Sequence, residues 1–414
     1  MGVYHITGGV PLHGDVRIHG AKNSALPILA ATLLTKGRCV LHNCPEISDV
    51  DVALEILRCL GCKTEREGEC VLVDTYAASS HEIPIALMQK MRAAIIFLGA
   101  LLTRFGEAKL SQPGGCALGE RPIDLHLMGL RHMGVRCECN GECLHCKVDA
   151  MRGCTFALPF PSVGATENLL LVALGCKEEI ILCNAAKEPE ITDFIGFLRA
   201  CGAEIDDFGS VLHIRGGSPL HGACYTVMPD RMEAATYLAA AAITRGSLHL
   251  TQMCPQHLTA VTQVLCKGGC EIDIAETQMH LRCRRLKAVS PIRTAPYDGF
   301  PTDAQAPIMA LLATAQGVSV IEEAIFSDRF RHVPQLQKMG ANICATRRYA
   351  IIDGVERLHG AELAATDLRG GAAMVLAALS AEGKSRITNT HHMERGYAEL
   401  VPTLQRIGAQ ITME

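Results

Sequence analysis

Tryptophan is absent from this chain of 414 residues, and aromatic residues make up only 4% of it. Its hydrophobic content of 49% therefore comes mainly from Ala, Leu, Ile and Val, which suit small-residue helices packed closely on sheets. Single hydrophobic cores stop growing beyond about 250–300 residues. We therefore expect two domains.

An excess of charge is also lacking, because the formal net charge is only −4. This balance gives no reason to expect nucleic acid or a membrane surface as a partner. No apolar run reaches the ~18 residues of a membrane-spanning helix. The start of the chain alternates like a strand and lacks the basic and apolar regions of a signal peptide. We expect a cytoplasmic protein with neither kind of partner.

Motifs of nucleotide-driven, redox and zinc chemistry are missing as well. AEGKSR at 381–386 resembles a phosphate-binding loop, but Ala378 stands where that loop requires its first glycine. No GxGxxG follows a predicted strand, and no HExxH occurs. We therefore expect no cofactor and no metal.

Cysteine, by contrast, is abundant, with 20 residues. In a chain this long without an export signal, we expect reduced thiols instead of a disulfide framework. One cluster has the composition of a zinc site and comprises Cys137, Cys139, Cys143 and Cys146. The interpretation that we favour is a β-hairpin turning at Asn140-Gly141, because the cysteine pairs lack the usual zinc-ligand spacing.

The clearest feature that is present is an internal repeat of about 70 residues. Six segments share Leu-x-x-x-Gly before a short strand-like run, and their glycines are Gly61, Gly134, Gly202, Gly269, Gly340 and Gly408. A second series of apolar segments, such as AAITRGSLHL, lies between them. A glycine just past a helix adopts the left-handed conformation without steric cost, so both series predict a helix, a glycine cap and a strand.

The repeats divide three and three near residues 226–233, which predicts an α/β fold in two domains. The first domain spans residues 22–228, and the second spans 1–21 and 229–414. We expect a first strand at Val3–Ile6 to pair with a strand near Val16–Ile18, and these strands to close the C-terminal half.

A glycine-rich loop, QPGGCALGERPIDLH, is the most unusual stretch. Gly114 and Gly115 precede Cys116, and Arg121 follows just before a helical pattern. A nearby arginine and a helix start both favour a reactive thiolate. Most cysteines in folded proteins are buried filler, but the flanking glycines favour a functional role here.

Basic residues also stand in unusual places. Lys22 and Asn23 lie where a strand leads into a helix, whose first amides attract phosphate or carboxylate, although an ordinary solvated helix start is an equal alternative. Arg92 lies within an apolar helical pattern, LMQKMRAAIIFLGALL, where its charge requires a partner or a ligand. Three more arginines follow an acidic residue closely and are Arg329, Arg369 and Arg395.

Asp303 opens a further small-residue helix, where it can cap the helix or act as a base. Together with the basic residues, it predicts a site for a polyanionic substrate.

Specific motifs run along essentially the whole chain and include GAKNSALPILAA, KMRAAIIFLGALL, QPGGCALGERPIDLH, PSVGATEN, EPEITD, FPTDAQA, ATDLRGGAA and ERGY. In these motifs the sequence resembles the UDP-N-acetylglucosamine enolpyruvyl transferase family. The resemblance implies a two-domain inside-out α/β barrel built from six βαβ-type units. It also implies transfer of enolpyruvyl from phosphoenolpyruvate to the 3-hydroxyl of UDP-N-acetylglucosamine. That reaction is the first committed step of peptidoglycan synthesis, on which cell shape and cell division depend.

The resemblance further implies roles for individual residues. Cys116 would protonate phosphoenolpyruvate and react with fosfomycin, and Asp303 would position or deprotonate the sugar hydroxyl. Phosphoenolpyruvate would be held by Lys22, Arg121 and Arg395, with support from Asn23 and Arg92. The nucleotide sugar would contact Arg121, Pro122, Ile123, Asp124, Leu125, Ser162, Val163, Gly164 and Ile325. Arg329 and Arg369 would lie near the closed site.

Two positions depart from the family pattern, because Phe160 and Ser48 stand where lysines are common. Both changes remove positive charge, so we expect weaker affinity for the UDP group. One alternative is the shikimate branch of the same fold, against which the loop cysteine and the GAKN start argue. Another is a paralogue that binds the nucleotide sugar without turnover, against which the retained Lys22, Cys116 and Asp303 argue.

Overall fold

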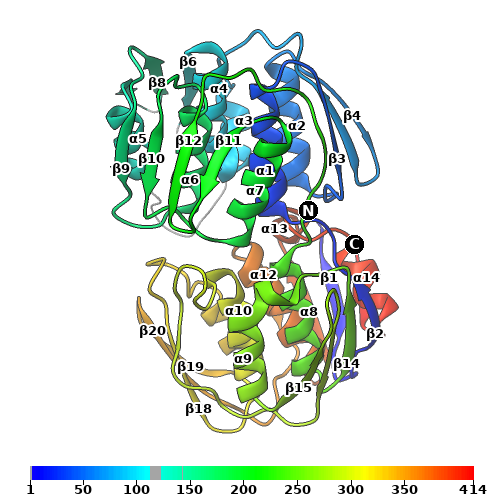
Figure 1. The fold of residues 1–414 in the computed structure, drawn as a ribbon. Helices are drawn as coiled ribbons and strands as arrows, with labels where there is room; N and C mark the ends of the chain where they lie inside the picture. Colours follow the sequence, from blue (N-terminus) through cyan, green and yellow to red (C-terminus); the bar gives the residue numbers. More distant parts are fainter. Residues whose placement is uncertain (1, 112–122, 142) are drawn as a thin grey trace. The chain divides into compact units, whose positions relative to one another are not determined.

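The computed structural model describes residues 2–111, 123–141 and 143–414. These residues form two compact units (Figure 1). The 20–228 unit contains the described residues between those numbers, and the 229–414 unit also includes residues 2–19. The predicted Cys116, Arg121 and Pro122 lie outside the described residues.

Three sheets form the outside of the 20–228 unit. Their orders are β13-β3-β5-β4, β6-β8-β7 and β11-β12-β10-β9. The strands are β3 (Arg38–His42), β4 (Lys63–Glu67), β5 (Cys70–Asp74), β6 (Glu107–Ser111), β7 (Val135–Asn140), β8 (Cys143–Val148), β9 (Cys154–Ala157), β10 (Ile180–Cys183), β11 (Glu204–Asp207), β12 (Val211–Arg215) and β13 (Cys224–Thr226). In each sheet a hairpin pairs antiparallel with the strand that follows a buried helix.

The helices of this unit differ in burial. Two are buried along almost their whole length, α1 (Lys22–Ala31) and α6 (Val163–Ala173), and α4 (Phe97–Phe105) is buried over its first six residues. The others bury part of their surface and are α2 (Ser48–Cys59), α3 (Ile85–Lys90), α5 (Asp124–His132) and α7 (Pro189–Ala200), with short turns η1 (Thr32–Leu34) and η2 (Arg92–Ile96). Ala and Leu are common in these helices, and their side chains, which are less bulky than aromatic rings, allow the helices to approach closely.

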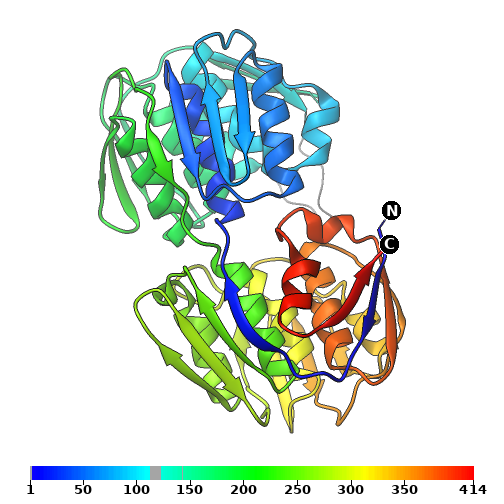
Figure 2. The same cartoon turned by 90° about the vertical axis from the view of Figure 1, so that its right-hand side faces the viewer.

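The 229–414 unit repeats this plan, with sheets around a centre of helices (Figure 2). Its strands are β1 (Tyr4–Thr7), β2 (His13–Arg17), β14 (Ser247–Thr251), β15 (Cys270–Ile274), β16 (Met279–Cys283), β17 (Ile292–Arg293), β18 (Val318–Glu322), β19 (Asn342–Ala345), β20 (Tyr349–Asp353), β21 (Glu362–Ala364), β22 (Lys384–Thr388) and β23 (Gln410–Met413). The buried helices α8 (Arg231–Ile243), α10 (Thr302–Leu312) and α12 (Leu368–Ser380) contact one another. The remaining helices are α9 (Thr259–Lys267), α11 (Val333–Lys338), α13 (His391–Glu394), α14 (Leu400–Arg406) and η3 (Pro255–Leu258).

The glycine of every Leu-x-x-x-Gly segment has the predicted left-handed backbone. All six φ angles lie between 90° and 99°. The prediction is wrong for two members of the second series, because neither Gly175 nor Gly246 is left-handed. In AAITRG the left-handed residue is Arg245, with φ of 58°. Gly246 is needed there for a different reason, because a Cβ on it would lie 2.1 Å from the Leu12 carbonyl oxygen.

The first strand closes the C-terminal half, but not with the predicted partner. β1 pairs antiparallel with both β22 and β23, and places Tyr4 opposite Ile387 and Met413. β2 instead pairs parallel with β14, so the predicted pairing of the first two strands is wrong. The physical reason lies at Gly9, whose amide donates to the Leu379 carbonyl and directs the chain onto the end of α12.

The helix predicted across LMQKMRAAIIFLGALL is also wrong, because it is broken into α3, η2 and α4. Met91 has an extended backbone, with φ of −140° and ψ of 122°, and this breaks the helical hydrogen bonding before Arg92.

The cysteine-rich segment forms the predicted hairpin, with β7 opposite β8. Every described cysteine is a free thiol. Within residues 2–111, 123–141 and 143–414, no group of three or more His, Cys, Asp or Glu side chains could hold a metal ion.

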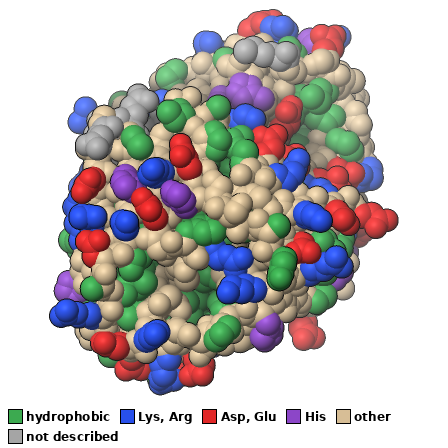
Figure 3. Space-filling model, turned by 90° about the horizontal axis from the view of Figure 1, so that it is seen from above, with side chains coloured by type: hydrophobic (Ala, Val, Ile, Leu, Met, Phe, Trp, Pro, Cys, Tyr) green, Lys and Arg blue, Asp and Glu red, His purple; other side chains and the backbone are tan. Residues whose placement is uncertain are grey.

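The described helices include none that is both long and apolar enough to cross a membrane. On the face drawn in Figure 3, basic and acidic side chains are interspersed and do not gather into a patch of one sign.

Candidate active site

Lys22, the first residue of α1, forms a buried ion pair with Asp49 in the first turn of α2. The Nζ and Oδ2 atoms are 2.6 Å apart, and only 11% and 3% of the two side chains are exposed. A lysine this deeply buried requires a partner, because removing an ammonium from water is costly. Asp49 thus fixes the position of Lys22, while the neighbouring Asn23 is exposed.

Two segments predicted to contact the nucleotide sugar meet where α5 and α6 begin. Ser162 caps α6, and its Oγ accepts a hydrogen bond from the Ala165 amide at 3.4 Å. Val163 and Gly164 form the first turn of α6, and α5 packs against this helix. The α5 segment contributes Ile123, Asp124 and Leu125, of which Ile123 and Leu125 are half-buried and Asp124 is exposed.

Arg92 opens η2 in the same unit and is half-buried. Burial and the nearby charge of Arg92 lower the pKa of His126 to about 4, while Asp124 opposes this shift. The fold therefore brings Arg92 close to the segment 123–125, from which it is separated in sequence.

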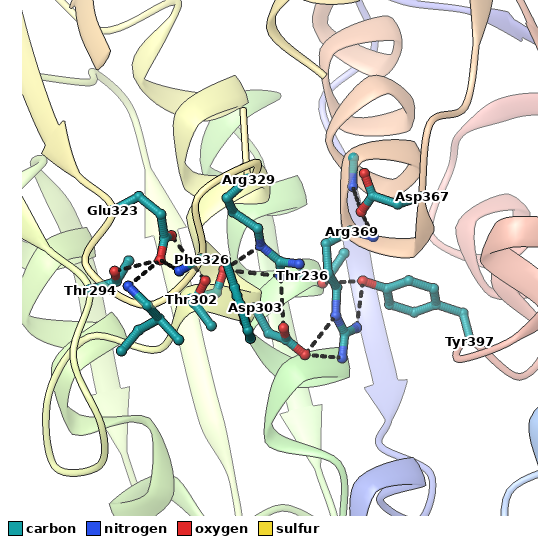
Figure 4. Close-up of polar contacts among 12 residues, drawn as sticks. Thr236, Thr294, Thr302, Asp303, Glu323, Phe326, Arg329, Asp367, Arg369 and Tyr397 are labelled. Carbon is teal, nitrogen blue, oxygen red and sulfur yellow. Dashed lines mark hydrogen bonds and ion pairs between the residues drawn. The ribbon is translucent and has the colours of Figure 1, made fainter. Parts of the chain in front are cut away.

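Asp303 is the centre of the polar cluster in the 229–414 unit (Figure 4). Its Oδ1 accepts a hydrogen bond from Arg329 Nη2 at 2.7 Å. Its Oδ2 accepts two from Arg369, from Nε at 3.2 Å and from Nη2 at 3.1 Å. The prediction that Asp303 caps α10 is wrong, because Pro301 holds the capping position and the Asp303 side chain points to the arginines.

The two arginines are held by further contacts. Arg329 Nε and Nη2 donate to the Thr302 carbonyl at 3.3 and 3.2 Å. Arg369 Nη1 donates to the Tyr397 hydroxyl at 3.1 Å, and this hydroxyl bonds Thr236 Oγ1 at 2.8 Å. Burial lowers the pKa of Arg369, but the Tyr397 hydroxyl and the carboxylates of Asp303 and Asp230 outweigh it and raise this pKa above the ordinary value.

The acidic neighbours that singled out these arginines in the sequence have other partners. Asp328 pairs with Arg331 at 3.7 Å, at the surface. Asp367 caps α12, where its Oδ1 accepts hydrogen bonds from the amides of Arg369 and Gly370. The acidic neighbours in the sequence thus drew attention to Arg329 and Arg369, but the carboxylate that pairs with both side chains is Asp303.

Glu323 is a buried carboxylate that organises the surroundings of Asp303. Its Oε1 accepts hydrogen bonds from Thr294 Oγ1 and the Ile325 amide, each at 2.9 Å. Its Oε2 accepts one from Thr302 Oγ1, also at 2.9 Å. Glu323 therefore ties the loop of the predicted Ile325 to the first turn of α10 (Figure 4).

Arg395 follows α13 directly and is half-buried. Burial, His391 and Arg395 together lower the pKa of His392. The predictions missed Asp49, Glu323 and Tyr397. A buried lysine or arginine signals that a partner exists, but the sequence does not say which residue it is.

The sequence matches the family described as EPSP synthase (3-phosphoshikimate 1-carboxyvinyltransferase) over residues 6–404. It is 45% identical to UDP-N-acetylglucosamine 1-carboxyvinyltransferase 2 of Caldanaerobacter subterraneus subsp. tengcongensis, with 99% of each chain covered. It is 43% identical to UDP-N-acetylglucosamine 1-carboxyvinyltransferase of Lawsonia intracellularis, with 98% of each covered.

Solved structures show the same fold. The enolpyruvyl transferase NikO from Streptomyces tendae has a TM-score of 0.90 and 27% identity, and the match covers 100% of this chain and 98% of that one. EPSP synthase from Acinetobacter baumannii has a TM-score of 0.78 at 20% identity, with 100% of each chain covered, and supports the fold alone.

Proposed function

Because the chain belongs to the family of UDP-N-acetylglucosamine 1-carboxyvinyltransferases, we propose that it transfers enolpyruvyl from phosphoenolpyruvate to the 3-hydroxyl of UDP-N-acetylglucosamine, with release of phosphate. The full-length similarity described above carries this proposal, and the geometry around Asp303 and Lys22 supports it. The reaction supplies peptidoglycan synthesis, and hence cell shape and division, from a cytoplasmic location.

Lys22 would bind the phosphate of phosphoenolpyruvate. Its carboxylate partner Asp49 favours the charged ammonium and holds it at the start of α1. A phosphate arriving there would meet both this charge and the positive end of the helix. We assign Arg121 and Arg395 to the same substrate, with Asn23 and Arg92 in support.

Asp303 would receive the sugar hydroxyl. An arginine on each of its oxygens favours the charged carboxylate and fixes its orientation. The side chain is 31% exposed, so an incoming hydroxyl can reach the carboxylate. Asp303 therefore accepts a hydrogen bond from the 3-hydroxyl and takes its proton as the new carbon–oxygen bond forms.

Cys116 would be the acid for the other proton. As the hydroxyl oxygen bonds to the central carbon of phosphoenolpyruvate, the methylene carbon takes a proton from the thiol and becomes a methyl group. Loss of phosphate, with a proton from that methyl group, then restores the double bond in the enolpyruvyl ether. Basic residues stabilise the negative charge of the departing phosphate.

The nucleotide sugar would be held by segments 121–125 and 162–164 and by Ile325, with Arg329 and Arg369 bordering Asp303. Phe160 is 41% exposed and Ser48 is exposed at the start of α2. Neither can supply the cation that relatives of the family often have there, so we expect weaker affinity for the UDP group.

The decisive experiment measures phosphate release from phosphoenolpyruvate with two acceptors. We expect release with UDP-N-acetylglucosamine and none with shikimate 3-phosphate. Absence of release with the nucleotide sugar would refute the proposal, and release with shikimate 3-phosphate alone would establish the other branch of the fold. Binding of the nucleotide sugar without release would identify a non-catalytic paralogue.

A further inference from the structure

Asn168, on α6, has a fully buried side chain whose orientation is fixed by two backbone groups. Its Oδ1 accepts a hydrogen bond from the Gly99 amide at 2.7 Å. Its Nδ2 donates to the Ile95 carbonyl at 3.1 Å. An amide N–H can only donate and a carbonyl can only accept, so the side chain cannot be reversed.

This orientation determines which nitrogen of His126 carries the proton. Asn168 Nδ2 lies 2.9 Å from His126 Nδ1 and 3.4 Å from the Gly164 carbonyl oxygen. Because Nδ2 is a donor, Nδ1 must be an acceptor, and the proton of the neutral ring lies on Nε2. Protonation of Nδ1 would set a donor against a donor and break the contact.

Two glycines allow this close packing. A Cβ on Gly164 would lie 3.2 Å from His126 Cε1 and 3.4 Å from Nε2. A Cβ on Gly99 would lie 2.6 Å from the Asn168 carbonyl oxygen and 2.9 Å from its Oδ1. The imidazole therefore rests directly on the first turn of α6, and α4 begins directly beside Asn168.

The pair thus joins three separate segments of the 20–228 unit. Ile95 belongs to η2, which starts at Arg92, and His126 follows the segment 123–125. Gly164 belongs to the segment 162–164. We propose that Asn168 and His126 are positioning residues that hold these three segments in register for the nucleotide sugar. The identity of that ligand rests on the proposed function, whereas the register itself does not.

If this contact only stabilised the core, its loss would not affect one substrate more than the other. The charged groups known to face His126 are Arg92 and Asp124, one on each of two of the joined segments. Loss of the contact would therefore disturb two segments assigned to the nucleotide sugar, 123–125 and 162–164, but only one residue assigned to the support of phosphoenolpyruvate, Arg92. The Lys22–Asp49 pair, which would hold phosphoenolpyruvate, lies on α1 and α2. We expect the KM for UDP-N-acetylglucosamine to rise more than the KM for phosphoenolpyruvate, and more than kcat changes.

The test compares three substitutions in the full chain. His126→Leu removes the acceptor, and we expect it to raise the KM for UDP-N-acetylglucosamine about tenfold, with kcat and the KM for phosphoenolpyruvate changed less than about threefold. His126→Asn, whose Oδ1 can take the place of Nδ1, should restore most of the loss. His132→Leu is the matched control on the same helix, because His132 is exposed, and it should leave all three constants unchanged. Equal KM values for parent and His126→Leu would overturn the proposal.

A second measurement reads the tautomer directly and does not depend on catalysis. The ¹⁵N spectrum of the imidazoles, with His126 assigned through His126→Asn, should show the Nε2–H tautomer down to pH 5. Asn168→Asp replaces the donor by an acceptor, so it should move the His126 titration to higher pH and raise the KM for the nucleotide sugar. If His126→Leu does not fold, Asn168→Asp takes its place in the kinetic comparison.

An Nδ1–H tautomer, or a titration of the parent His126 near pH 6.5, would refute the arrangement. If the parent shows the expected tautomer but neither binds nor converts UDP-N-acetylglucosamine, the proposed function fails. In that case the register is supported, but its assignment to this ligand is rejected.

Discussion

Asp303 Oδ2 accepts two hydrogen bonds from Arg369, a residue 66 positions further along the chain. Both belong to buried helices of the 229–414 unit, since Asp303 lies in the first turn of α10 and Arg369 near the start of α12. Packing of these helices therefore sets the direction of the carboxylate before any substrate arrives. Preorganisation of this kind avoids the cost of orienting polar groups during the reaction.

We expect Asp303→Asn to lower kcat by at least about 100-fold, because the amide keeps the shape of the side chain but cannot take the hydroxyl proton. Steady-state phosphate release measures this effect. The matched control is Asp328→Asn, since Asp328 pairs with Arg331 at the surface and exposed ion pairs contribute little. Equal kcat values for Asp303→Asn and the parent would exclude Asp303 as the base.

Asp49→Asn should destabilise the 20–228 unit by about 3 kcal/mol, because it leaves the buried ammonium of Lys22 without its counter-ion. We also expect a higher KM for phosphoenolpyruvate. Urea denaturation and steady-state kinetics measure the two effects. Asp51→Asn is the control from the same helix, as Asp51 is 61% exposed in its pair with Arg66, and it should change neither quantity appreciably.

Two buried histidines predict how stability depends on pH. Burial is the largest cause that lowers the pKa of both His126 and His332 to about 4. Their pKa is near 6.5 in the unfolded chain, so the unfolded state binds more protons between pH 6.5 and 4. The free energy of unfolding should therefore fall as the pH drops through this window, by about 3 kcal/mol per histidine in full.

Denaturation of the parent at pH 7 and at pH 5 measures this change in the free energy of unfolding. His126→Asn is measured in the same way, and because both proteins have the same carboxylates, the difference between them isolates the contribution of His126. The variant should show a smaller difference between the two pH values than the parent. An identical difference would mean that His126 titrates alike in the folded and unfolded chain.

Two pairs of thiols stand directly opposite each other across hairpins, Cys137 with Cys146 and Cys270 with Cys283. The hydrogen bonds from Asp149 to Gly134 and from Ala275 to Gln278 fix the phase of each ladder. Counting along the strands places both cysteine pairs at positions without ladder hydrogen bonds, where the Cα atoms are about 4.5 Å apart.

We expect oxidised glutathione to form a disulfide in each pair, with two hydrogens lost from the protein and two glutathione thiols released. The distance is compatible with disulfide geometry, and hydrogen bonds from Cys146 and Cys270 lower the pKa of the Cys137 and Cys283 thiols. Peptide mapping identifies the products. Cys143→Ser should retain the first disulfide and Cys146→Ser should lose it, so retention in the latter would show that the register is wrong.

Fosfomycin should add once to the protein in the presence of UDP-N-acetylglucosamine, at Cys116. Intact mass and peptide mapping detect the adduct. Cys116→Ser should abolish it, and Cys59→Ser should not, although Cys59 is an exposed thiol. An adduct on any other cysteine, or none, would argue against a reactive Cys116.

Much of the fold could be predicted because its determinants are local. Gly61 and Gly408 need only their own backbone conformation to end a helix, so their spacing alone revealed the repeat. The break at Met91 was not predictable from apolar periodicity, because its cause is one extended residue inside an otherwise helical pattern.

The candidate site was harder to predict because its contacts join distant segments. Asp303 and Arg369 were both selected, but their pairing depends on how α10 packs against α12. The contact between Asn168 and His126 left no signal in the sequence, since each residue also occurs as an ordinary core polar group. Residue types thus indicate chemistry, and only packing assigns the partners.

The pairing of β1 with β22 and β23 also governs the order in which the protein can form during synthesis. β1 must wait for two strands that lie about 400 residues further along the chain. Residues 20–228 can meanwhile complete their own core, because both ends of that segment are already present. The 229–414 unit therefore cannot assemble this sheet until β23 has been made, and a chain truncated before Gln410 leaves one edge of β1 without its partner strand.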